Sequence, residues 1–138
     1  MKSRTVISRS EEETIALGRE LGRELQGVVL LIGNLGAGKT TLAKGIIEGR
    51  NAGVADEVSS PTFTLIHQHG DVSHIDLYRL DEAREVESLG LGDLFGSGNL
   101  VLMEWAERFP ELLPEERTEI RLRTLPDDTH EITVAGAD

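Results

Sequence analysis

A glycine-rich loop at residues 33–40 carries the strongest structural information in this sequence. It reads Gly-Asn-Leu-Gly-Ala-Gly-Lys-Thr, which fits the phosphate-binding pattern G-x-x-x-x-G-K-[ST]. An unbroken apolar run at 27–33 leads into it, as expected of a strand buried on both faces of a sheet, and residues 40–49 read as a helix. In such a loop the backbone N–H groups converge on phosphates, Lys39 adds positive charge and the Thr40 hydroxyl can reach Mg²⁺. The loop therefore predicts an α/β fold that binds a nucleotide.

The rest of the chain alternates between helix and strand patterns. Ser10 and Glu13 form a capping-box pattern ahead of leucines at every fourth position, which predicts a helix at 11–25. Further strands are predicted at 63–68, 72–77, 100–103, 118–124 and 130–134, and a short acidic helix at 82–89. Turn residues at 126–128 join the last two strands into a C-terminal β-hairpin. We expect a single P-loop NTPase-like α/β domain over residues 1–138, with a mixed parallel and antiparallel sheet flanked by helices.

Composition and charge limit the classes of function. The chain has 138 residues, of which 38% are hydrophobic and 28% charged, and no apolar run in it could span a bilayer. It has no cysteine, and its first residues lack the apolar core of a secretion signal, so we expect a cytoplasmic protein without a membrane partner. The net charge is −11, and residues 51–138 hold 19 acidic and 6 basic residues, which argues against direct binding of DNA or RNA. The acidic half either faces a basic protein partner or is a solvated surface.

Two carboxylates compete for the metal position that a phosphate-binding loop requires. Glu104 follows the apolar run LVLM, where a second buried strand would place an acid beside the loop. Asp76 follows VSHI, which is less apolar, so strand quality favours Glu104 for the metal. Asp76 is then left for a second role beside the γ-phosphate, or for a turn or cap ahead of the acidic helix. Trp105 is the only tryptophan, and its place directly after Glu104 suggests a wall of the site.

Other features favour one type of nucleotide base but do not distinguish between the possible reactions. Residues 59–63, SSPTF, lie where many P-loop NTPases place a segment that senses Mg²⁺ and the γ-phosphate, although Ser-Pro is also a common turn. No metal-binding spacing relates the four histidines, which are His67, His69, His74 and His130. The chain lacks an N-K-x-D motif, which favours adenine over guanine nucleotides. A small-molecule kinase and a non-catalytic nucleotide-sensing module remain alternatives to an ATPase.

Four motifs in order resemble those of the TsaE family. They are GNLGAGKTTL, SSPTFTLIHQ, HIDLYRL with the acidic stretch after it, and LMEW followed by LLP. The resemblance covers about residues 5–134, and HxDxYR after a phosphate-binding loop is its most specific part. It implies a P-loop fold, hydrolysis of ATP, and work with TsaD and TsaB in threonylcarbamoyl modification of the tRNA adenosine next to the anticodon. If tRNA is bound only through those partners, the acidic charge is no obstacle.

The resemblance also implies roles for individual residues. It makes Lys39, Asp76 and Glu104 catalytic, with Thr40 and Glu104 at the Mg²⁺ position and Asp76 near the γ-phosphate, where we expect it to order water. It also implies that the closing hairpin, which holds His130, can contact the nucleotide. The residues expected to contact ATP are Gly33, Asn34, Leu35, Gly36, Ala37, Gly38, Lys39, Thr40, Thr41, Thr62 in the SSPTF segment, Trp105, and Ser10 on the adenine side.

Overall fold

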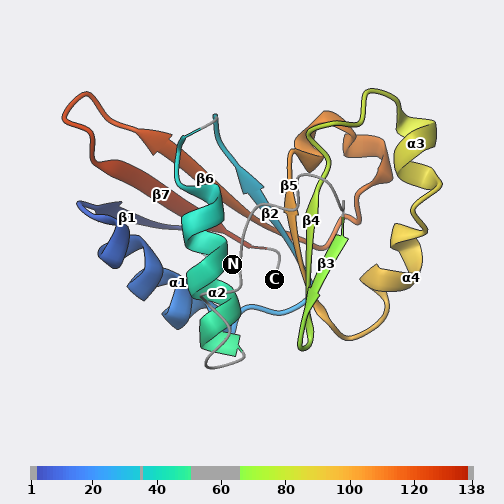
Figure 1. Cartoon of the computed structure of the whole chain (residues 1–138), viewed down its shortest axis with the longest axis horizontal. Helices are drawn as coiled ribbons and strands as arrows, with labels where there is room; N and C mark the ends of the chain where they lie inside the picture. The colour runs from blue at the N-terminus through green and yellow to red at the C-terminus, as the bar shows by residue number, and fades with distance from the viewer. Residues whose placement is uncertain (1–2, 35, 51–65, 137–138) are drawn as a thin grey trace.

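A computed structural model describes residues 3–34, 36–50 and 66–136, and these form a mixed sheet with helices on both faces (Figure 1). The strands lie in the order β1-β7-β6-β2-β5-β4-β3. The elements are β1 (Arg4–Ser8), α1 (Glu11–Glu24), β2 (Val28–Ile32), α2 (Lys39–Arg50), β3 (Ile66–His69), β4 (Val72–Asp76), α3 (Ala83–Glu87), α4 (Leu91–Phe95), β5 (Leu100–Glu104), the 3₁₀ turns η2 (Ala106–Arg108) and η3 (Pro110–Leu112), β6 (Thr118–Thr124) and β7 (His130–Ala135).

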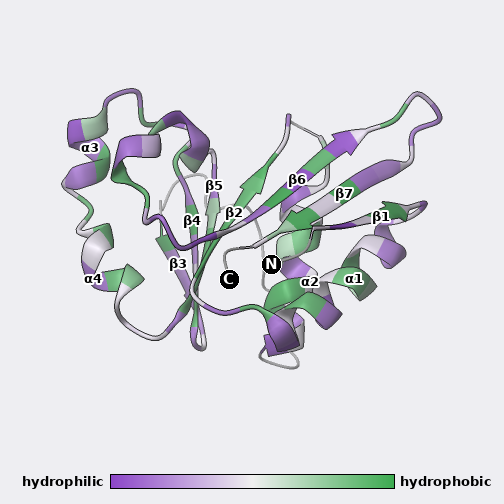
Figure 2. Cartoon of the chain, turned by 180° about the vertical axis from the view of Figure 1, so that it is seen from behind, coloured by the Kyte–Doolittle hydropathy of each residue, from purple (hydrophilic) through white to green (hydrophobic). Residues whose placement is uncertain are grey.

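The centre of the sheet is parallel and its edges are antiparallel. Strands β6, β2, β5 and β4 run parallel to one another, whereas β7, β1 and β3 are added at the two edges through antiparallel pairs. The central position of β2 follows from its sequence, because VVLLI can be buried on both faces. Figure 2 shows this strand coloured hydrophobic at the core of the molecule, while β6 carries alternating colours. The expected α/β fold with a mixed sheet and a C-terminal hairpin is confirmed.

Two hydrophobic cores fill the two faces of the sheet. One core joins α1 and α2 to the even-numbered side chains of β5, such as Leu100 and Leu102. The other joins α3, α4 and the 3₁₀ turns to the odd-numbered side chains, such as Val101 and Met103. Figure 1 shows α1 and α2 on one side of the sheet and α3 and α4 on the other. Side chains of one strand alternate between faces, so Glu104 belongs to the face that α2 covers.

Helices α1 and α2 approach each other through glycines. A Cβ atom at Gly45 in the middle of α2 would lie 2.3 Å from the carbonyl oxygen of Ile15 and 2.9 Å from the Cα atom of Gly18. At Gly22 the same addition would lie 2.2 Å from the carbonyl oxygen of Ile46. The two backbones are therefore in direct contact, which fixes the start of α1 relative to the start of α2.

The sequence patterns miss β1, and the acidic helix is shorter than the patterns predict. Strand β1 is short, its first residues are exposed, and its partner β7 lies at the far end of the chain, with Arg4 opposite Val134. The helix expected at 82–89 ends at Glu87, and Gly90 separates it from α4 with a left-handed φ of 70°. The strand expected at 63–68 is described only from residue 66 onward. Among the described residues, no helix is long and apolar enough to cross a membrane.

Candidate functional site

The predicted phosphate-binding loop joins the end of β2 to the start of α2. Gly36 and Gly38 have φ values of 82° and 103°, a region that residues with a Cβ atom rarely adopt. The N–H group of Leu42 donates to the carbonyl of Gly38, so the helix begins at Lys39 and its first N–H groups have no helical acceptor. Free N–H groups and the positive end of the helix dipole favour a bound phosphate at this position. Leu35 and Thr62, which the sequence also predicts here, lie outside the described residues.

Lys39 is buried and bound to groups of the protein itself. Its side chain is only 5% exposed, and its Nζ atom donates to the carbonyl oxygen of Gly33 over 2.7 Å. The same ammonium lies 3.4 Å from the centre of the Trp105 ring, a cation–π contact. Burial lowers the pKa of Lys39 below its ordinary value, although the nearby carboxylates of Glu104, Glu107 and Asp76 oppose that effect. The negative charges around Lys39 therefore compensate only part of its lost hydration.

The two candidate acids end neighbouring parallel strands. Strand β5 lies directly beside β2, with Glu104 opposite Leu31, and β4 lies beside β5, with Asp76 opposite Glu104. Glu104 is 3% exposed and Asp76 is 8% exposed. Residues that pair across parallel strands point to the same face, so both carboxylates lie on the face that α2 covers, at the edge where Lys39 begins the helix. The sheet thus brings together one cation and two acids that are far apart in the sequence.

The polar residues before Asp76 do not make β4 less buried than β5. The segment VSHID is buried at every position, including Ser73 and His74, so β4 is as much an interior strand as β5. The Oδ1 atom of Asp76 accepts a hydrogen bond from the N–H group of Tyr78 over 2.9 Å. Asp76 therefore does stabilise the turn after β4, and it does so while buried beside Glu104.

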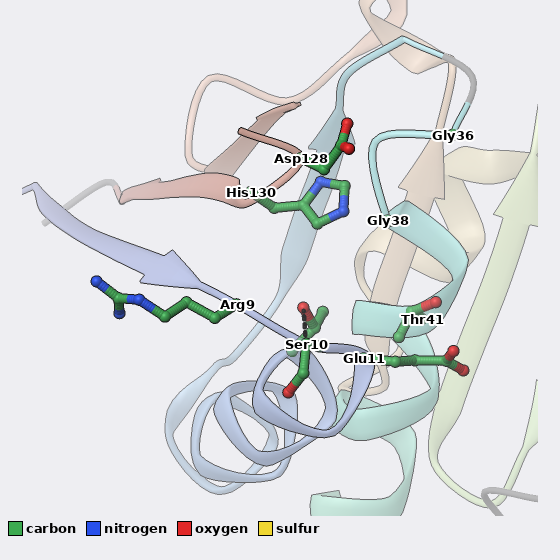
Figure 3. A pocket seen from close by; sticks show the side chains of 9 residues that line it. Arg9, Ser10, Glu11, Gly36, Gly38, Thr41, Asp128 and His130 are labelled. Carbon is green, nitrogen blue, oxygen red and sulfur yellow. Dashed lines mark hydrogen bonds between the residues drawn. The ribbon is translucent and has the colours of Figure 1, made fainter. Parts of the chain in front are cut away.

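A cavity of about 290 Å³ opens next to the loop (Figure 3). It is lined by Arg9, Ser10, Glu11, Thr14, Gly36, Gly38, Thr41, Asp128 and His130. Ser10 caps α1 by accepting from the N–H group of Glu13, which is the predicted capping interaction. In Figure 3 the His130 ring, the start of α1 and Thr41 surround one hollow beside the loop. Ser10 and His130, which the sequence predicts near the nucleotide, thus line the same cavity.

Comparison with known proteins decides the family. A sequence profile described as "Threonylcarbamoyl adenosine biosynthesis protein TsaE" matches residues 8–132. The chain belongs to the TsaE family. It is 40% identical to the tRNA threonylcarbamoyladenosine biosynthesis protein TsaE of Bacillus subtilis, with 96% of this chain and 84% of that protein covered. It is 42% identical to the TsaE protein of Treponema pallidum, with coverage of 94% and 98%.

A solved structure supports the same assignment. A crystal structure of Bacillus subtilis YdiB superposes on this chain with a TM-score of 0.79 and 31% sequence identity, covering 99% of this chain and 87% of that one. The resemblance to the TsaE family that the motifs indicate is therefore confirmed by sequence and by fold.

His74 is a site residue that the sequence patterns miss. Its side chain is fully buried, and its Nε2 atom lies 2.6 Å from the Oε2 atom of Glu104. Metal-binding spacing, the property by which the sequence patterns judge the histidines, does not reveal this contact. The sequence pattern that could have revealed His74 is the alternation in HID, which places His74 and Asp76 on one face of β4.

Trp105 and Arg108 shape the end of β5. Trp105 has a left-handed φ of 67°, which is unusual for an aromatic residue. The centre of its ring lies 5.0 Å from the centre of the Tyr78 ring. Arg108 donates to the carbonyl oxygens of Leu77 and Tyr78 over 2.7 and 3.1 Å, and also to that of Leu80. The turns that follow β4 and β5 are therefore tied to each other, which fixes Asp76 and Glu104 in relation to Trp105.

The donor chemistry of the site fits Mg²⁺. The hydroxyl of Thr40 and the carboxylates of Glu104 and Asp76 are hard oxygen ligands, as Mg²⁺ prefers. Within residues 3–34, 36–50 and 66–136, no group of three or more His, Cys, Asp or Glu side chains could hold a metal ion. Mg²⁺ is commonly held by one or two carboxylates together with phosphates and water.

Lys39→Met is expected to change how stability depends on pH. The pKa of Lys39 in the folded protein lies below 10.5, so between the two values the unfolded chain binds more protons than the folded chain. The free energy of unfolding of the wild type therefore rises, relative to that of Lys39→Met, as the pH increases toward 10.5. Urea unfolding of both proteins between about pH 8 and pH 10.5 measures the difference. A difference that stays constant over this range would contradict a desolvated ammonium group.

Proposed function

We propose that this chain is a Mg²⁺-dependent ATPase that serves threonylcarbamoyl modification of the tRNA adenosine next to the anticodon. The observation that carries the proposal is the pair of buried carboxylates, Asp76 and Glu104, at adjacent strand ends facing Lys39. A phosphate-binding loop alone would support only nucleotide binding. Hydrolysis also requires a metal ligand and a group that orients water, and two acids can fill these two roles.

Each residue of the site has its own role in hydrolysis. The free N–H groups at the start of α2 and the ammonium of Lys39 hold the β- and γ-phosphates, with Lys39 leaving the carbonyl of Gly33 to do so. Thr40 and Glu104 hold Mg²⁺, which neutralises charge on the phosphate oxygens. Asp76 accepts a hydrogen bond from the water that attacks the γ-phosphorus. The bond from that phosphorus to the bridging oxygen then breaks, and ADP and phosphate leave.

The cavity beside the loop suits the nucleoside. Its walls come from the start of α1, the start of α2 and the β6–β7 hairpin, with Ser10, Thr41 and His130 among them. These residues offer hydroxyl and imidazole groups, and His130 offers a flat ring against which a base can stack. The direct contact between the α1 and α2 backbones holds Ser10 at this place.

The tRNA and partner parts of this proposal rest on the family assignment. The curated relatives are named tRNA threonylcarbamoyladenosine biosynthesis proteins. A net charge of −11 disfavours a direct grip on tRNA phosphates, so we propose that TsaD- and TsaB-type proteins in the cytoplasm bring the tRNA. Hydrolysis by the isolated chain is then slow, and the assembled partners accelerate it.

Phosphate release from ATP is the test of this proposal. We expect slow, Mg²⁺-dependent release by the chain alone and faster release when TsaD- and TsaB-type proteins are added, while a gel-shift assay detects no tight tRNA binding by the chain alone. Transfer of the γ-phosphate to a small molecule in place of water would support a kinase instead. Tight, salt-sensitive binding of tRNA by the isolated chain would overturn the indirect role.

A further inference from the structure

His74 presents a buried polar side chain that packing does not require. It is 0% exposed, and within the described part of the chain its Nδ1 atom has no hydrogen-bond partner. Its Nε2 atom lies 2.6 Å from the Oε2 atom of Glu104, which is itself 3% exposed. Leaving one ring nitrogen buried and unpaired costs free energy that an apolar side chain of similar size would avoid. His74 therefore lowers the stability of the core relative to an apolar residue. This cost points to a role for its contact with Glu104 other than packing.

The sheet register brings His74 to Glu104 from the side away from the phosphate-binding loop. Strand β5 separates β4 from β2, so the loop lies on one side of Glu104 and His74 on the other. His74 pairs with Leu102 and Asp76 pairs with Glu104, which places the imidazole one step behind the carboxylate on the same face. As a metal ligand the carboxylate of Glu104 would be ionised and could only accept, so the Nε2 atom of His74 would donate to it. The contact uses one carboxylate oxygen and limits the rotation of the group.

We propose that His74 is a positioning residue that fixes the carboxylate of Glu104 for the metal ion. This rests on the proposed function, because it takes Glu104 as the Mg²⁺ ligand. Groups that hydrogen-bond to metal ligands orient them, and their loss commonly lowers metal affinity by about 10- to 100-fold. His74 acts through Glu104 and touches neither nucleotide nor water.

Metal binding separates this role from a structural one. Electron paramagnetic resonance counts free Mn²⁺, a substitute for Mg²⁺, during titration of the protein with ADP at saturation. His74→Leu removes the donor, His74→Gln retains an amide donor close to the Nε2 position, and His74→Asn places its amide too far from Glu104. Ser73→Ala is the matched control, because Ser73 is also fully buried in β4 but donates to Gln68 on the other face of the sheet.

We expect the Mn²⁺ concentration at half-saturation to rise about tenfold or more in His74→Leu and His74→Asn. His74→Gln should stay within about threefold of the wild type, and Ser73→Ala should match it. ADP affinity measured in EDTA should be equal in all proteins. If His74→Leu does not fold, the comparison of His74→Gln with His74→Asn still decides.

Two outcomes would overturn the proposal, and a third concerns the function itself. Unchanged Mn²⁺ binding in His74→Asn and His74→Leu would show that Glu104 needs no positioning. Equal losses in His74→Gln and His74→Asn would show a purely structural role. Failure of the wild type to bind ADP with Mn²⁺ would instead refute the proposed nucleotide site.

Discussion

Replacing Asp76 with asparagine is expected to lower the rate of ATP hydrolysis by about 10²- to 10⁴-fold, the usual loss when a group that orients or deprotonates a nucleophile is removed. An amide retains the oxygen that accepts from the N–H group of Tyr78, so the turn after β4 should persist. ATP affinity should change little, because the loop and Lys39 bind the phosphates. Phosphate release under saturating ATP, with partner proteins present, measures the rate, and calorimetry measures the affinity.

Asp93→Asn is the control for Asp76→Asn. Asp93 is exposed on α4, in the layer on the opposite face of the sheet, and its replacement removes the same charge. We expect wild-type hydrolysis from it. If Asp76→Asn hydrolyses ATP at the wild-type rate, Asp76 has no part in orienting water and serves only the turn.

Gly45→Ala is expected to destabilise the protein by about 2–4 kcal/mol, because it forces a Cβ atom into a neighbouring backbone. Alanine normally stabilises the interior of a helix relative to glycine by about 0.5–1 kcal/mol. Here the added atom would lie 2.3 Å from the carbonyl oxygen of Ile15, and neither helix backbone can yield without moving the other. The free energy of unfolding in urea measures the loss.

Gly92→Ala is the matched control for Gly45→Ala. Gly92 also lies in a helix, α4, but a Cβ atom there would meet nothing within 4 Å. Its replacement should leave stability unchanged or raise it slightly. Similar stability of Gly45→Ala and Gly92→Ala would contradict the close contact of α1 and α2.

The sequence predicts best the features that depend on neighbouring residues. The loop at 33–40 needs glycine at fixed positions, a buried strand before it and a helix after it, and all of these are local. Ser10 caps α1 through Glu13, three residues away. Glu104 is recognisable because four apolar residues precede it in one strand. The family resemblance then adds a role for Asp76 that local patterns leave open.

The features that the sequence does not predict depend on contacts between distant segments. VSHI ranks below LVLM as an interior strand because the partners of its polar side chains are not evident from the pattern. Ser73 donates to Gln68 in β3, and His74 contacts Glu104 in β5. The glycines of α2 look like weak helix formers until the backbone of α1 is placed against them. Strand β1 likewise depends on β7, which is the last strand of the described chain.

A crystal structure with Mg²⁺ and a non-hydrolysable ATP analogue tests the division of labour between the two acids most directly. The account predicts Thr40 and Glu104 at the metal, with any direct oxygen ligand at about 2.0–2.1 Å. It also predicts that the Nζ atom of Lys39 has moved from the carbonyl of Gly33 to the phosphates, and that Asp76 lies beside the γ-phosphate with a water between them. Asp76 bound to the metal, with Glu104 away from it, would contradict the account.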